Sequence, residues 1–202
     1  MELQSPFRVV TAGVDGDVLG ALAQADVEHT VAEVHARIGR STEGVRRSLD
    51  RLASQGIVQR LRIGRSTAYR LNRDHLAAPA ILELAELSAT LIARITESMR
   101  GWAAPPVFAA IFGSTARRDM RTDSDIDLLM ITDDPTSALW EGQVGDLAGA
   151  VERWTGNDVR PLVLSTSEAT DAAAKVPVLR EVLAEGIPVY GERAAFRRLI
   201  GA

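Results

Sequence analysis

The chain has 202 residues, of which 46% are hydrophobic, 4% aromatic and 25% charged, and it contains no cysteine. This composition predicts a soluble globular protein with one large or two small domains, and it excludes a disulfide scaffold and Cys-ligated zinc. The N-terminus has neither a basic start nor an apolar run, and no stretch approaches membrane-spanning length. We therefore expect a cytoplasmic protein without a membrane partner.

The net charge of −4 is unevenly distributed along the chain. Residues 1–77 carry 11 basic and 9 acidic side chains, whereas residues 78–202 carry 12 basic and 18 acidic ones. Between Arg37 and Arg73, ten arginines stand against two acidic residues, a local excess of +8. An excess of that size inside an acidic protein indicates a polyanionic partner for this segment.

The N-terminal third begins with two expected helices. Asp15 or Asp17 is expected to cap the first one. Thr30 and Glu33 form a capping-box pair that opens the second, and Gly39 ends it.

A third helix and a basic hairpin follow. Ser41 caps the helix, apolar residues then recur at spacings of four and three, and Gly56 ends it. The period then changes to two on both sides of a turn at 64–66, which predicts a β-hairpin. This order is that of a winged helix-turn-helix, and residues 15–73 resemble bacterial winged-helix transcription regulators.

In a winged helix the third helix enters the major groove and the hairpin lies along the backbone or minor groove. Arginine suits both phosphates and guanine edges, and no aromatic platform for single strands is present, so double-stranded DNA is the expected partner. The candidate DNA-binding residues are Ser41, Thr42, Arg46, Arg47, Arg51, Arg60, Arg62 and Arg65. The alternative is a solvated charged face on a domain that contacts other proteins.

The middle of the chain predicts a connector. Residues 81–99 form an amphipathic helix with one apolar stripe, which either packs on a neighbouring domain or pairs two copies of the chain as a homodimer. The sequence thus predicts a winged helix-turn-helix domain over 1–77, a connector helix over 78–104 and an α/β domain over 105–202.

Strand-like and helical runs alternate beyond the connector. Strands are expected at 107–112, 126–132 and 159–164, and helices at 135–154, 168–174 and 178–185. Asp134 is the expected cap of the first of these helices, with Pro135 at its first position.

Two carboxylates stand at the start of the second strand, at Asp125 and Asp127. Residues two apart on a strand project to one face, with β-carbons about 7 Å apart. Carboxylates at that spacing suit Mg²⁺, either one ion or a pair.

A phosphate-binding corner is expected where the strand at 107–112 ends. Gly113 lets backbone approach a ligand closely, and Ser114 adds a hydroxyl at the start of a short helix. Arg117, Arg118 and Arg121 follow and neutralise phosphate charge in this interpretation.

The unit of strand, Gly-Ser, ten residues and Asp-Ile-Asp resembles the signature of the nucleotidyltransferase superfamily typified by DNA polymerase beta, in particular its small bacterial members. The resemblance implies a mixed-sheet α/β domain that binds a nucleoside triphosphate (NTP), with Gly113 and Ser114 on the phosphates and Asp125 and Asp127 on Mg²⁺ or Mn²⁺. The implied reaction is attack of an acceptor hydroxyl on the α-phosphate, which gives a nucleotidylated product and pyrophosphate.

Enzymes of that superfamily generally place a third carboxylate on a following strand. Arg160 stands at the expected position in this chain, and Asp158, two residues earlier, is the candidate substitute. Asp158 is equally well interpreted as a loop residue.

Three functions therefore stay open. The first is a DNA-binding protein whose nucleotidyltransferase domain binds NTP with Mg²⁺ and transfers a nucleotide to an unidentified protein or small-molecule acceptor. The second is a transcription regulator whose nucleotidyltransferase fold is a non-catalytic nucleotide sensor or interaction module, for which Arg160 is the main argument. The third is an antibiotic-modifying or protein-modifying transferase in which the winged helix only recruits substrate.

Overall fold

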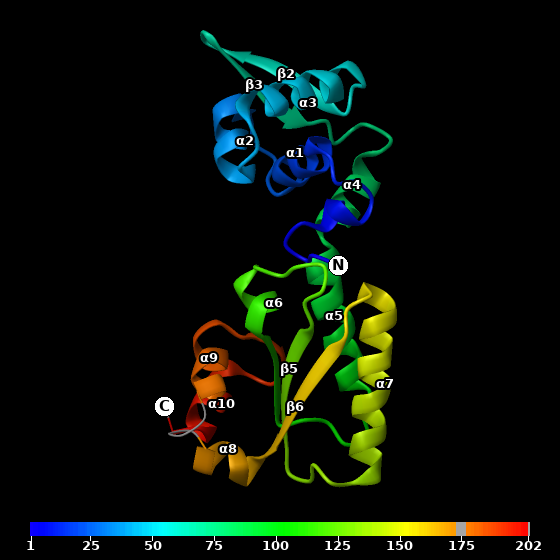
Figure 1. The fold of residues 1–202 in the computed structure, drawn as a ribbon, viewed down its shortest axis with the longest axis vertical. Helices are drawn as coiled ribbons and strands as arrows, with labels where there is room; N and C mark the ends of the chain where they lie inside the picture. The colour runs from blue at the N-terminus through cyan, green and yellow to red at the C-terminus, as the bar shows by residue number, and fades with distance from the viewer. Residues whose placement is uncertain (173–176, 202) are drawn as a thin grey trace. The chain divides into compact units, whose positions relative to one another are not determined.

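A computed structural model describes residues 1–172 and 177–201, and the chain divides into two compact units (Figure 1). The first unit comprises Glu2 and Gln4–Ser88, and the second comprises Met1, Leu3 and Ala89–Ala202. Each unit has its own hydrophobic core. None of the helices in the described ranges combines the length and apolar character needed to cross a bilayer.

The first unit is a small bundle of helices beside a three-stranded sheet. Its elements are η1 (Pro6–Val9), α1 (Val14–Ala23), β1 (His29–Thr30), α2 (Val31–Ile38), α3 (Thr42–Ser54), β2 (Val58–Ile63), β3 (Ser66–Leu71) and α4 (Ala78–Ala85). The strands are antiparallel in the order β1-β3-β2, and a two-residue turn joins β2 to β3, as the hairpin prediction required. Val18, Leu49 and Leu71 are buried in the shared core.

The helix ends in this unit follow local side-chain chemistry. Thr30 Oγ1 accepts a hydrogen bond from the Glu33 amide at 3.3 Å, and Glu33 Oε2 accepts one from the Thr30 amide at 2.7 Å, so the predicted capping box is confirmed. The predicted cap of the first helix is wrong. Gly13 is the N-cap of α1, and Asp15 and Asp17 are the second and fourth residues of the helix.

The predicted helix over 81–99 is broken in the structure. α4 ends before Glu86, and α5 (Leu87–Arg100) begins after it. Leu91, Ile95 and Met99 of α5 are buried in the core of the second unit. This half of the apolar stripe is therefore satisfied within one chain and is not available to a second copy.

The second unit is built on a four-stranded mixed sheet in the order β6-β5-β4-β7. Its remaining elements are β4 (Phe108–Phe112), α6 (Gly113–Arg117), β5 (Ile126–Thr132), α7 (Ala138–Thr155), β6 (Val159–Ser165), α8 (Thr166–Ala172), α9 (Pro177–Glu185), β7 (Ile187–Tyr190) and α10 (Arg193–Leu199). β5 and β6 are parallel, and β4 is antiparallel to both β5 and β7. The mixed α/β architecture expected from the sequence is confirmed.

Helices cover both faces of this sheet (Figure 1). Alternate residues of β5 supply the two sides: Leu128 packs with α5 and α7, whereas Leu129 packs with α9 and α10. This alternation explains why β5 has five consecutive buried residues, from Leu128 to Thr132.

Two helix predictions need correction. α7 begins at Ala138 rather than at Pro135, because the Ser137 hydroxyl accepts a hydrogen bond from the Trp140 amide while Asp134 bonds to Thr136 instead. The helix predicted over 168–174 corresponds to α8, and positions 173 and 174 lie outside the described residues.

Leu129→Ala should destabilise the second unit by about 2–5 kcal/mol, because Leu129 is completely buried in the centre of the sheet. The three tryptophans, Trp102, Trp140 and Trp154, all belong to this unit, so their fluorescence during chemical denaturation reports on it alone. Leu139→Ala is the matched control, since Leu139 is 55% exposed. Equal effects of the two substitutions would contradict the assigned core.

Candidate functional site

The junction of β4, α6 and β5 forms a tight corner. Phe112, the last residue of β4, is opposite Asp127 of β5 in the antiparallel register. Gly113 then turns the chain into α6 with φ at +65°, a left-handed conformation that favours glycine. A β-carbon at this position would collide with the Asp127 carboxylate. The backbone at Gly113 and the side chain of Asp127 are thus held against each other.

Two carboxylates lie on one side of β5 at this corner. Ile126 and Leu128 are buried in the core between the sheet and α5 and α7, which places Asp127 on the opposite side of the strand. Asp125 immediately precedes the strand and is also partly buried. The shared face predicted for the two aspartates agrees with this register.

The Asp127 carboxylate is in an unfavourable environment for its charge. Burial raises the pKa of Asp127 above its usual value, and the negative charges of Asp125 and Glu181 act in the same direction. Arg160 and Arg117 oppose this shift in pKa. Burial has the largest effect, so the site holds a carboxylate whose charge is incompletely compensated.

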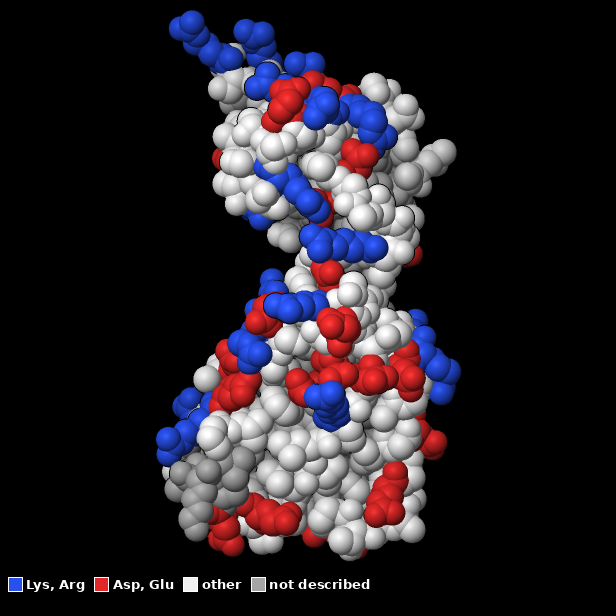
Figure 2. Space-filling model, in the orientation of Figure 1, with Lys and Arg blue, Asp and Glu red and all other residues white. Residues whose placement is uncertain are grey.

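Arg160 is the basic side chain closest to this pair. It lies opposite Asp127 in the parallel register of β5 and β6, and its Nη2 atom is 2.7 Å from Asp125 Oδ2. The Arg160 side chain is 73% exposed, whereas that of Asp125 is 21% exposed. Figure 2 shows acidic side chains gathered over the β5–β6 half of the sheet, with a basic side chain among them.

Asp158 does not complete a group of three carboxylates in this structure. Its side chain is exposed, and its carbonyl oxygen accepts a hydrogen bond from the Ile126 amide at 2.8 Å. Among the described residues, no three acidic or histidine side chains are close enough together to hold a metal ion. Asp125 and Asp127 remain the candidate carboxylate donors at the corner.

The arginines predicted to bind phosphate differ in their surroundings. Arg117 donates hydrogen bonds to Glu181 at 2.5 Å and to Glu185 at 3.3 Å, and so ties α6 to α9. Arg118 is exposed and has a left-handed backbone with φ at 59°. Ser114 is partly buried in the first turn of α6. The two glutamates were missed at the sequence level, although their spacing of four residues marks one face of a helix.

Asn157 is a further residue that the sequence did not single out. It is buried, and its side-chain amide donates a hydrogen bond to the Ser124 carbonyl at 2.8 Å. This bond fixes the loop directly before Asp125 to the loop directly before β6. Asn157 therefore positions the start of both strands that carry the charged residues.

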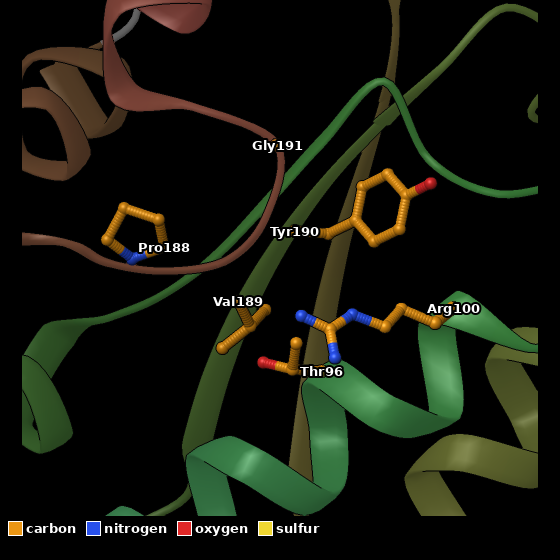
Figure 3. Close-up of a pocket in the computed structure, with 6 residues that line it drawn as sticks. All are labelled: Thr96, Arg100, Pro188, Val189, Tyr190 and Gly191. Atoms are coloured by element: carbon orange, nitrogen blue, oxygen red, sulfur yellow. The ribbon is translucent and has the colours of Figure 1, made fainter.

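A separate groove of about 550 Å³ lies between α5 and β7 (Figure 3). Thr96 and Arg100 line it from α5, and residues 188–191 line it from β7 and the residue after it. None of these residues belongs to the corner around Gly113.

The residues predicted to bind DNA lie on α3 and on the β2–β3 hairpin of the first unit. Figure 2 shows basic side chains protruding at the hairpin end of this unit. Ser41 is the N-cap of α3, where its hydroxyl accepts a hydrogen bond from the Gly44 amide at 3.1 Å, and Thr42 is exposed beside it. Val45 and Leu49 face the core, so the arginines of α3 face solvent.

Some of these arginines are paired with acidic residues of the same unit. Arg51 forms an ion pair with Asp15 of α1, and Arg60 lies 3.7 Å from Asp50. These contacts reduce the positive charge that the two arginines present to a ligand.

The other arginines are more available. Arg47 has only a 3.9 Å contact with Glu43, and both side chains are well exposed. Arg46, Arg62 and Arg65 are exposed and form no ion pair within the described residues. The available positive charge is thus concentrated on one side of α3 and at the tip of the hairpin.

Gly113→Ala should lower the stability of the second unit by about 1–2 kcal/mol more than Gly156→Ala does. Both glycines have a positive φ, but the new methyl group has open space at Gly156 and meets the Asp127 carboxylate at Gly113. Tryptophan-detected denaturation compares the two variants directly. Equal losses would show that the corner accommodates a side chain.

One comparison with known proteins covers this corner. The family model described as "Polymerase beta, Nucleotidyltransferase" matches residues 103–193. No curated protein matches the sequence. Two solved structures are similar to 55% of this chain: the "toxin-antitoxin with AMP-PNP" (15% identity, TM-score 0.40, 81% of that chain) and a mutant of the "toxin-antitoxin MntA-HpeT" (13%, 0.39, 80%). The match to the family model, and not these two similarities, identifies residues 103–193 as a nucleotidyltransferase-type domain.

Proposed function

We propose that the second unit binds a nucleoside triphosphate together with Mg²⁺ or Mn²⁺ and transfers the nucleotide to an acceptor hydroxyl on a protein or small molecule. The first unit, as a winged helix-turn-helix, binds double-stranded DNA in this proposal. The observation that carries the enzymatic half is the corner at which the Gly113 backbone meets Asp127, inside the segment matched by the nucleotidyltransferase family model.

The donor set at the corner fits a hard divalent cation. Asp125 and Asp127 offer carboxylate oxygens, the ligands that Mg²⁺ prefers. Burial raises the pKa of Asp127, so a cation placed there relieves an electrostatic cost that Arg160 relieves only in part. These two residues are therefore the proposed metal ligands.

The chain supplies binding and orientation for the reaction. A bound divalent cation supplies charge neutralisation of the phosphates and polarisation of the phosphorus centre. Gly113 and Ser114 present backbone and a hydroxyl to the phosphates, and Arg118 adds an exposed positive charge. The acceptor oxygen bonds to the α-phosphorus, the bond from that phosphorus to the bridging oxygen breaks, the hydroxyl proton is released and pyrophosphate leaves.

The available arginines support DNA binding by the first unit. Arg46 and Arg47 project from α3, and Arg62 and Arg65 from the hairpin, which are the elements that a winged helix places on DNA. Guanidinium groups bind phosphates and the guanine edge in the major groove. An acidic protein with this local excess of positive charge favours a duplex over a protein partner.

A second candidate is a transcription regulator in which the nucleotidyltransferase domain binds nucleotide without turning it over. The ion pair of Arg160 with Asp125, and the exposed position of Asp158, favour it, because two carboxylates are left where a third would help activate the acceptor. This candidate requires nucleotide binding without pyrophosphate release, and a change in DNA affinity on nucleotide addition.

Asp125→Asn and Asp127→Asn should each weaken Mg²⁺-dependent NTP binding and reduce nucleotide transfer by about two orders of magnitude or more, because the cation loses a charged ligand. Transfer is measured with labelled NTP, Mg²⁺ and cell extract, and binding with a nonhydrolysable NTP.

Asp146→Asn is the matched control, since Asp146 is an exposed acidic residue of α7 outside the corner. Labelling by Asp125→Asn at the wild-type level would remove the enzymatic proposal. Binding without any labelled product in the wild-type protein would select the sensor.

Arg46→Ala and Arg62→Ala should each weaken duplex binding and lower the slope of log affinity against log salt by about 1, since each removes one phosphate contact. Arg73→Ala is the control within the same unit, because Arg73 lies after the hairpin and is 3.4 Å from Asp26. A slope that is flat in the wild-type protein would favour a transferase whose first unit recruits a protein substrate.

A further inference from the structure

Arg160 lies next to both carboxylates of the corner, Asp125 and Asp127. The paired positions of Asp127 and Arg160 put both side chains on the same face of the sheet, and the guanidinium reaches diagonally to Asp125. The Arg160 guanidinium and a bound cation therefore compete for the same carboxylate oxygen.

The ion pair between Arg160 and Asp125 can be broken at little cost to the fold. Its arginine is 73% exposed, and ion pairs with that degree of exposure contribute little to stability. Because its side chain is mostly exposed, the Arg160 guanidinium has room to move, while the backbone of the edge strand β6 is held by seven paired positions with β5. Losing Asp125 as a partner thus costs the fold little.

We propose that Arg160 is a switched counter-ion: it holds Asp125 when no cation is bound, and it transfers to the phosphates when a divalent cation and a nucleoside triphosphate occupy the corner. This inference rests on the proposed function and adds to it a phosphate ligand, Arg160, at the strand position where a third carboxylate was expected. A planar guanidinium can donate two parallel hydrogen bonds to the oxygens of one phosphate. Its contact with Asp125 joins Nη2 to Oδ2.

The switch predicts opposite effects of one substitution on two ligands. In Arg160→Gln, Mn²⁺ alone should bind about fivefold more tightly, because the competing charge is gone. A nonhydrolysable NTP at saturating Mn²⁺ should bind about tenfold more weakly, because a charged contact to phosphate is lost. Free Mn²⁺ is measured by electron paramagnetic resonance, and nucleotide binding by calorimetry.

Two further variants separate charge from shape. Arg160→Lys keeps the charge, so it should bind Mn²⁺ alone as the wild-type protein does and bind the nucleotide with intermediate affinity. Arg197→Gln removes an exposed arginine from α10 and should change neither affinity. Thermal unfolding of each variant verifies that the fold is intact.

The outcomes distinguish this inference from the proposed function. Unchanged or weaker Mn²⁺ binding by Arg160→Gln, unchanged or tighter nucleotide binding, or an increase in Mn²⁺ affinity in Arg160→Lys equal to that in Arg160→Gln would each overturn the switch. If the wild-type protein binds the nucleotide and only these differences are missing, the proposed function stands without the switch. If the wild-type protein binds neither ligand, both fail.

Discussion

The contact between the Gly113 backbone and the Asp127 carboxylate is the constraint on which the second unit depends. It requires a residue without a β-carbon at the end of β4, and it requires the antiparallel register that places Phe112 opposite Asp127. A one-residue slip of β5 would turn Asp127 toward α5 and α7 and bring Leu128 to the face that carries the corner. The apolar residues that fix this register therefore also determine which face of the sheet the Asp127 carboxylate lies on.

The charges around that contact form a connected set. Arg160 contacts Asp125 from β6, and Arg117 contacts Glu181 and Glu185 from α6, so elements on both sides of the corner carry a positive charge bonded to a negative one. Such exposed pairs contribute little to stability. They matter for ligand binding, because a charged ligand that binds one of these side chains has to displace its ion-pair partner.

Local sequence patterns predicted much of the fold, and the failures have physical causes. The capping box at Thr30 and the span of β5 depend on neighbours in sequence, and both agree with the structure. The start of α7 was misplaced because Asp134 and Ser137 are both good caps, and the choice depends on where the chain leaves β5. The single helix over 81–99 failed because its two halves belong to different cores.

Only those parts of the site that follow from local sequence patterns could be predicted. The spacing of Asp125 and Asp127 implied a shared face, and the glycine between strand and helix implied a close approach. By contrast, the contacts of Arg160 with Asp125 and of Arg117 with α9 join residues 35 to 68 positions apart, so no local pattern announces them. They arise because parallel pairing of β5 with β6, and packing of α9 on the sheet, carry charged side chains to the corner. The tertiary fold therefore converts an apparent defect in a carboxylate motif, an arginine on β6, into a basic group in direct contact with the site.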